Sequence, residues 1–242
     1  FFKNKKLLPV DEFFQNVLYD REIGYYSKKH PFGKKGDFIT APKISNLFSE
    51  MIAIWIISAW QNLGKPKHLN IIELGPGDGT LTKILLEVFK KFPDFNSAKK
   101  IYLYEISNFL KKVQKKKIQD SCVKWIKNFK YINDGPVIFF GNEFFDAMPI
   151  KQFKYEKSIF LEKNFQINKK RKIETVFKNA SKIDIKNIKS YSCLNKLKFI
   201  EFPKYGLVQL KKIVKKILKL KGCLLLIDYG YVKPSNKNTL QS

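Results

Sequence analysis

Arginine, histidine and cysteine are scarce in this chain of 242 residues, and their scarcity narrows the kinds of site that the chain can carry. Lysine and arginine together number 47, yet only Arg21 and Arg171 are arginines, so lysine supplies almost all of the positive charge behind the net +26. A nucleic-acid interface favours arginine, because its guanidinium makes bidentate contacts with phosphate and guanine. We therefore interpret the charge as a solvated lysine surface, with an anionic partner as the alternative, and do not expect nucleic acid to bind.

The two histidines and three cysteines give no pattern typical of a metal centre. Cys122, Cys193 and Cys223 lie far apart without C-x-x-C spacing, so we expect no metal. Scattered cysteines are typical of a reducing compartment. The abundance of lysine, isoleucine, asparagine and phenylalanine favours a bacterial source and a cytoplasmic location, with the mitochondrial matrix as the alternative for a eukaryotic source.

Long hydrophobic runs are also absent. The longest is Met51–Trp60, which only Ser58 interrupts, and it is too short to span a bilayer. This run predicts a buried helix that extends to about Asn62, and no signal peptide is visible. We therefore expect no membrane span.

From residue 69 onward the apolar pattern alternates between strands and helices. Buried strands are predicted at 69–74, 101–105, 123–126, 137–141 and 223–228, and helices at 80–92, 107–118 and 205–219. This alternation predicts an α/β fold with a doubly wound, mainly parallel sheet. Residues 152–167 predict a hairpin insertion, whereas residues 173–203 give no clear pattern.

A glycine-rich turn joins the strand at 69–74 to the helix that follows it. The phosphate-binding pattern GxxxxGK[ST] fails here, and the dinucleotide pattern GxGxxG fails because Thr80 occupies its third glycine position. The pattern [DE]xGxGxG fits at Glu73, Gly75, Gly77 and Gly79, and it is typical of class I S-adenosyl-L-methionine-dependent methyltransferases. That cofactor carries an ammonium and a sulfonium, which a carboxylate such as Glu73 would favour.

Further acidic residues follow the other predicted strands. Ligands of open α/β sheets bind beyond the carboxyl ends of the strands, where Glu105 could accept hydrogen bonds from ribose hydroxyls. Glu143 and Asp228 end two more strands, and Asp146 lies nearby. Glu143 and Asp146 could orient a guanidinium acceptor, whose pKa is too high for easy deprotonation. The alternatives are that Glu105 is an ordinary exposed acid and that Asp146 caps a short helix.

The chain resembles the MidA-type methyltransferases, the family of the mitochondrial complex I assembly factor that methylates a protein arginine. The matching blocks are GYYSKKHPFGKKGDFITAP (24–42), LFSE and a tryptophan (47–60), ELGPGDGTL (73–81), NEFFDAMPIKQF (142–153), LIDYGY (226–231) and TLQ (239–241). The resemblance implies a seven-stranded Rossmann-like fold and the methylation of an arginine in the 49 kDa-type subunit of complex I.

The resemblance also assigns roles to residues of this chain. It places the cofactor, S-adenosyl-L-methionine, against Glu73, Gly75, Gly77, Gly79, Thr80 and Glu105. It places Asn142, Glu143 and Asp146 beside the transferred methyl group. It makes a lid or acceptor wall from Gly36, Asp37, Phe38 and Thr40, and we add Asp228 to this substrate side.

Two departures from the family pattern stand out. Asp78 occupies a position where arginine is frequent, and we expect its side chain to face outward. Similar proteins continue well beyond Ser242, so we expect the C-terminal strands of the sheet to be missing. We divide the chain into an N-terminal helical and lid segment, 1–66, and a cofactor-binding domain, 67–242, with an insertion at about 152–203.

Two other functions remain open at this point. The positive charge leaves room for a methyltransferase that acts on RNA or on another small acceptor. A non-catalytic factor that binds a complex I subunit during assembly is the other alternative, although such a factor would not need the glycine pattern.

Overall fold

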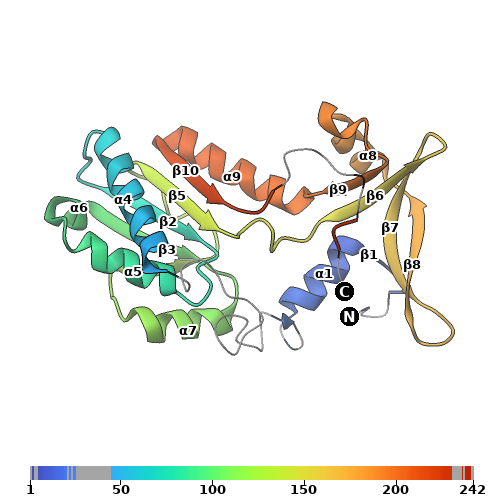
Figure 1. Ribbon diagram of the computed structural model, residues 1–242, viewed down its shortest axis with the longest axis horizontal. Coiled ribbons are helices and arrows are strands. Elements are labelled where there is room, and N and C mark those ends of the chain that lie inside the picture. The colour runs from blue at the N-terminus through green and yellow to red at the C-terminus, as the bar shows by residue number, and fades with distance from the viewer. Residues whose placement is uncertain are drawn as a thin grey trace. The chain divides into compact units, whose positions relative to one another are not determined.

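The computed structural model describes residues 2, 5–20, 22, 24, 25, 45–230, 236 and 238–240. The chain forms two compact units (Figure 1). The larger unit comprises Arg21–Asp146 and Leu210–Asp228, and the smaller comprises Phe1–Asp20, Ala147–Gln209 and Tyr229–Ser242. The sequence boundary that we place between residues 66 and 67 stays a prediction.

A five-stranded parallel sheet forms the centre of the larger unit, in the order β10-β5-β2-β3-β4 (Figure 1). Its strands are β2 (Leu69–Leu74), β3 (Lys99–Tyr104), β4 (Val123–Ile126), β5 (Val137–Asn142) and β10 (Gly222–Ile227). Every residue of β2 is buried, as expected for a central strand with helices on both faces. The predicted α/β fold with a parallel sheet is confirmed.

Helices cover both faces of this sheet because successive strand residues point to opposite sides. Ile71 packs in a core with α4 (Asn46–Asn62), α5 (Thr80–Phe89) and α6 (Pro93–Ala98), and Ile118 adds the end of α7 (Asn108–Ile118). Ile72 and Leu74 pack in a second core with Ile213 of α9 (Lys204–Leu220). The sheet is therefore doubly wound.

The smaller unit is built on an antiparallel sheet in the order β1-β7-β6-β9, with β8 paired to β7. The predicted hairpin is confirmed as β6 (Lys151–Glu156) and β7 (Ile159–Ile167). The segment without a clear pattern contains β8 (Ile173–Asn179), α8 (Lys182–Lys189), a short 3-10 helix (Ser192–Leu194) and β9 (Phe199–Phe202). β1 (Leu7–Pro9) and α1 (Val10–Tyr19) complete this unit, which is more than the hairpin insertion that we expected.

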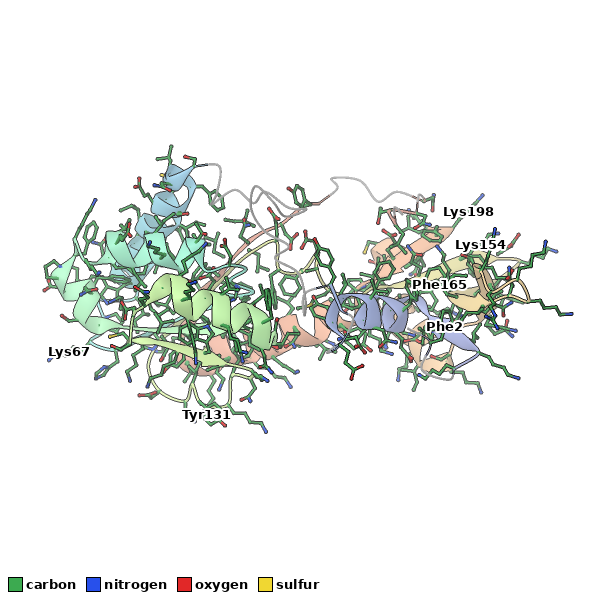
Figure 2. All side chains as sticks on the ribbon, turned by 90° about the horizontal axis from the view of Figure 1, so that it is seen from below. Phe2, Lys67, Tyr131, Lys154, Phe165 and Lys198 are labelled. Atoms are coloured by element: carbon green, nitrogen blue, oxygen red, sulfur yellow. The ribbon has the colours of Figure 1, made fainter. Side chains whose placement is uncertain are left out.

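The lysine-rich surface agrees with the solvated surface that the composition predicts. Lys67, Lys154 and Lys198 are exposed, and their side chains extend away from the ribbon (Figure 2). In the part of the chain that the structure describes, no helix combines the length and the apolar character that a membrane crossing requires.

Strand β10 begins at a glycine that tolerates no side chain. Gly222 has a φ of 152° and pairs with Val137 at the start of β5. A Cβ atom at this position would lie 1.8 Å from the carbonyl oxygen of Val137, so the two strands could not keep their spacing. The register of β10 against β5 thus depends on Gly222.

We expect Gly222→Ala to lower the free energy of unfolding by at least about 3 kcal/mol, because backbone must move to relieve the contact. Gly64→Ala is the matched control: Gly64 also has a positive φ, 84°, but nothing lies within 4 Å of its added Cβ. Backbone strain alone should lower the free energy of unfolding of Gly64→Ala by only about 1–2 kcal/mol. Urea denaturation measures the free energy of unfolding of both variants. Equal losses in Gly222→Ala and Gly64→Ala would show that the close contact between β10 and β5 at Gly222 is unimportant.

Candidate active site

The carboxyl ends of four parallel strands meet at one edge of the sheet. Leu74 at the end of β2 lies opposite Tyr104 of β3, and Ile227 of β10 lies opposite Asn142 of β5. This register brings the predicted residues that follow the strands to the same edge: Gly75, Glu105, Glu143 and Asp228. Ligands of open α/β sheets bind at such an edge.

The glycine turn after β2 has a backbone that only glycine adopts easily. Gly75, Gly77 and Gly79 have φ angles of 63°, 55° and 82°. A Cβ atom on Gly75 would lie 2.9 Å from a ring carbon of Phe144, so a side chain here would also displace the loop after β5. Thr80 follows as the first residue of α5. The glycines therefore allow the turn to adopt this backbone and to pack closely against Phe144.

Asp78 does not face outward, and that expectation was wrong. Its side chain is only 14% exposed and forms an ion pair with Lys117, with 2.7 Å between Oδ2 and Nζ. Its other oxygen accepts hydrogen bonds from the backbone N–H of Thr80 at 3.1 Å and from the Thr80 hydroxyl at 2.7 Å. Asp78 thus caps the start of α5 and ties the glycine turn to α7.

Glu73 is a buried carboxyl at the end of β2. It is 3% exposed, and the hydroxyl of Thr82 donates a hydrogen bond to it. Burial raises the pKa of Glu73 to about 8; the nearby charge of Asp78 acts in the same direction, and the Thr82 bond opposes the shift. A cation bound nearby would favour the ionised form of this carboxyl.

Glu105 follows β3 and is 6% exposed, so it is not the ordinary exposed acid of the alternative interpretation. Burial raises the pKa of Glu105, whereas hydrogen bonds from the backbone N–H of Ser107 and the side chain of Gln114 partly oppose the rise. These bonds measure 2.7 Å and 3.1 Å. Both donors hold the carboxylate at the edge of the sheet where a ribose would lie.

Gln114 is a site residue that the sequence analysis missed. It is completely buried on α7 in line with Leu110 and Ile118, at the spacing of an apolar stripe. Its side-chain amide contacts the glycine turn as well as Glu105. A polar residue in the middle of an apolar stripe was the available signal.

The end of β5 and the loop after it carry the three residues that we expect beside the acceptor. Asn142 and Glu143 are half-buried, and Asp146 is exposed. Glu143 has a positive φ of 52°, and its backbone N–H bonds to the carbonyl of Ile227 at 2.8 Å. Asp146 lies in a turn, and residues 147–150 form no helix that it could cap.

Asp228 shapes this loop. One of its carboxylate oxygens accepts hydrogen bonds from the backbone N–H groups of Phe145 at 2.9 Å and Asp146 at 3.3 Å. Asp228 thereby fixes the part of the loop that follows Glu143, while the side chain of Phe144 packs toward Gly75. A role for Asp228 toward the substrate stays a prediction. The expected lid residues Gly36, Asp37, Phe38 and Thr40 lie outside the described residues.

Residues 51–242 match a family of S-adenosyl-L-methionine-dependent methyltransferases. The chain belongs to this family. The resemblance to the MidA-type methyltransferases is thereby confirmed.

Similar proteins of known name support the family. The mitochondrial protein arginine methyltransferase NDUFAF7 of Xenopus laevis is 28% identical over 257 residues, which cover 96% of this chain and 59% of that protein. The homolog from Drosophila melanogaster is 31% identical over 169 residues, which cover 61% of this chain and 38% of that protein. The chain thus spans between about two fifths and three fifths of the length of these relatives.

A solved structure shares the fold. A superfamily member from Burkholderia thailandensis, bound to S-adenosyl-homocysteine, aligns with a TM-score of 0.75 at 20% identity. The alignment covers 93% of this chain and 59% of the other.

The residues at the edge of the sheet fit the cofactor of the family. Two buried carboxyls, Glu73 and Glu105, flank a turn of three positive-φ glycines. Carboxylates suit an ammonium, a sulfonium and ribose hydroxyls. In the described part of the chain, no group of three or more histidine, cysteine, aspartate or glutamate side chains could hold a metal ion.

The raised pKa of Glu73 predicts a pH-dependent difference between the wild type and Glu73→Gln. The folded state holds the Glu73 proton up to about pH 8, whereas the unfolded chain releases it near the ordinary value of 4.5. The stabilising effect of this proton is full below pH 4.5 and is lost as the pH rises to 8. Between these two pH values, the free energy of unfolding of the wild type should therefore fall by up to about 5 kcal/mol relative to that of Glu73→Gln.

Chemical denaturation at a series of pH values measures this difference. Glu87→Gln, which alters an exposed glutamate on α5, is the control and should show no comparable slope. A pH-independent difference between wild type and Glu73→Gln would contradict the burial argument.

Proposed function

We propose that this chain binds S-adenosyl-L-methionine at the edge of the parallel sheet and transfers its methyl group to an arginine of a protein. One observation carries the proposal: two buried carboxyls flank a glycine turn with bare backbone at the carboxyl ends of β2 and β3. The family of the chain supports the reaction, and the names of its NDUFAF7 relatives support the acceptor. The bound S-adenosyl-homocysteine of the structural neighbour supports the cofactor.

The cofactor would be held by residues from the carboxyl ends of two strands, β2 and β3. Glu73 and the turn of Gly75, Gly77 and Gly79 with Thr80 would hold its cationic amino-acid part, and Glu105 would accept hydrogen bonds from its ribose. When bound, S-adenosyl-L-methionine supplies an electrophilic methyl group on a sulfonium. Ionisation of Glu73 on binding would balance a positive charge of the ligand, so the buried carboxyl favours a cationic ligand over an anionic one.

The acceptor side of the site would use the loop after β5. Glu143 and Asp146 would bind the guanidinium of an arginine and align one nitrogen with the methyl carbon, and Asn142 would lie beside it. A nitrogen–carbon bond forms as the carbon–sulfur bond breaks, and the nitrogen then loses a proton. Glu143 is our candidate to accept that proton, because its backbone N–H is fixed to β10 while its side chain is half-buried.

The finer assignments follow the relatives. From the resemblance we propose a role in complex I assembly, with the 49 kDa-type subunit as the substrate. The resemblance also supports a location in the mitochondrial matrix or the bacterial cytoplasm. The net charge of +26 favours RNA as the second candidate acceptor. A binding factor without catalysis is the third.

A methyl-transfer assay tests the reaction. Labelled S-adenosyl-L-methionine is incubated with the chain and with either a complex I subunit or RNA, and label in arginine is measured. We expect label in the protein and none in RNA. Glu143→Gln should slow transfer by about 100-fold or more, as loss of a general base does, with affinity for S-adenosyl-homocysteine nearly unchanged.

Asp134→Asn is the control, because Asp134 is an exposed acid of the same unit that precedes β5, at the opposite end of this strand from the loop. It should transfer at the wild-type rate. Label in RNA alone would favour the second candidate. Cofactor binding without label in any acceptor would favour the binding factor, and full activity of Glu143→Gln would remove Glu143 from the chemistry.

A further inference from the structure

We propose that Gln114 is a positioning residue that couples the two halves of the cofactor site. It connects the glycine turn, which would hold the amino-acid part of the cofactor, to Glu105, which would hold the ribose. This inference rests on the proposed cofactor site and adds a residue that neither the glycine pattern nor the resemblance assigns.

The side-chain amide of Gln114 makes three hydrogen bonds in three directions. Its Nε2 donates to the carbonyl oxygen of Gly77 at 2.8 Å and to Oε2 of Glu105 at 3.1 Å. Its Oε1 accepts from the indole N–H of Trp125 on β4 at 2.8 Å. The donors and acceptors of the amide are thus matched by groups from three separate segments.

Trp125 fixes the orientation of this amide. An indole N–H can only donate, so the amide oxygen must face Trp125 and the NH₂ group must face Gly77 and Glu105. Both of those partners are acceptors, so no rotated amide would satisfy all three. The contact from Trp125 therefore sets the direction in which Gln114 acts on the site.

A residue concerned only with folding would be apolar at this position. Gln114 is completely buried and lies in line with Leu110 and Ile118 on α7, where leucine would pack without desolvating an amide. The cost of burying the amide is offset only because all its polar groups are bonded. The groups that it bonds are the carbonyl of the glycine turn and the ribose-side carboxylate.

The same face of α7 contacts the rest of the turn. Lys117 donates to Asp78 and to the Thr80 hydroxyl, at 2.7 Å and 2.8 Å. Ile118 lies against Gly79, where an added Cβ would come within 3.2 Å of its Cδ1. Residues three and four apart share a helix face, so α7 holds the turn at three consecutive points. Among these contacts, Gln114 alone also reaches Glu105.

Isothermal titration with S-adenosyl-homocysteine tests this role in the full chain. We expect Gln114→Leu to lower the affinity by about 10- to 30-fold, because two hydrogen bonds that orient the site are lost. Lys116→Gln, on the exposed face of α7, is the control and should bind as the wild type does. Because Gln114 acts through Glu105, the double variant Glu105→Gln with Gln114→Leu should lose less than the product of the two single losses.

Trp125→Phe gives a second measurement if Gln114→Leu does not fold. This change removes the indole donor from a half-buried side chain. Because the amide of Gln114 could then rotate, the affinity for S-adenosyl-homocysteine should fall about threefold. A purely structural role for Gln114 would lower the melting temperature of both variants without changing affinity in the folded protein.

The outcomes separate this inference from the proposed function. Absence of binding by the folded wild type would overturn the cofactor site and the coupling with it. Wild-type binding with unchanged affinity in Gln114→Leu, or in Trp125→Phe when the former does not fold, would overturn only the role of Gln114. Fully multiplicative losses in the double variant would show that Gln114 does not act through Glu105.

Discussion

The parallel register of the central sheet is the constraint on which the candidate site depends. Parallel pairing of β2 with β3 and β5, and of β5 with β10, makes these strands end together. Residues that lie far apart in the sequence, such as Glu73 and Asp228, are brought to one edge by backbone hydrogen bonds alone. Gly222 maintains this arrangement at the other end of the sheet, since any side chain there would push β10 away from β5.

Burial of acidic groups is the second physical feature of the site. A carboxyl that is removed from water without a cation keeps its proton, which is why the pKa of Glu73 rises to about 8. Burial raises the pKa of Glu105 as well, but two hydrogen-bond donors, one of them from Gln114, partly oppose that rise. The lysine-rich chain thus keeps two buried acids at the edge of its sheet. These acids favour a cationic ligand at this edge, although the net charge of the chain is positive.

Much of the larger unit could be predicted from the sequence because its signals are local. Strand β2 has the predicted bounds, Leu69–Leu74, since a short segment rich in leucine and isoleucine is followed directly by the glycine turn. Asp78 was placed wrongly because its partner, Lys117, comes from a helix 39 residues further along the chain. Strands β8 and β9 of the smaller unit, which pair with β7 and β6, were missed for the same reason. Strand partners are set by tertiary contacts that a short window of sequence does not contain.

Direct titration of the chain with S-adenosyl-homocysteine, with NAD as the comparison ligand, tests the central claim most directly. We predict binding of S-adenosyl-homocysteine in the micromolar range, with no measurable heat from NAD, because Thr80 occupies the third glycine position of the dinucleotide pattern GxGxxG. Tighter binding of NAD, or no binding of S-adenosyl-homocysteine by a chain whose circular dichroism shows it folded, would contradict the assignment of this edge of the sheet as the cofactor site.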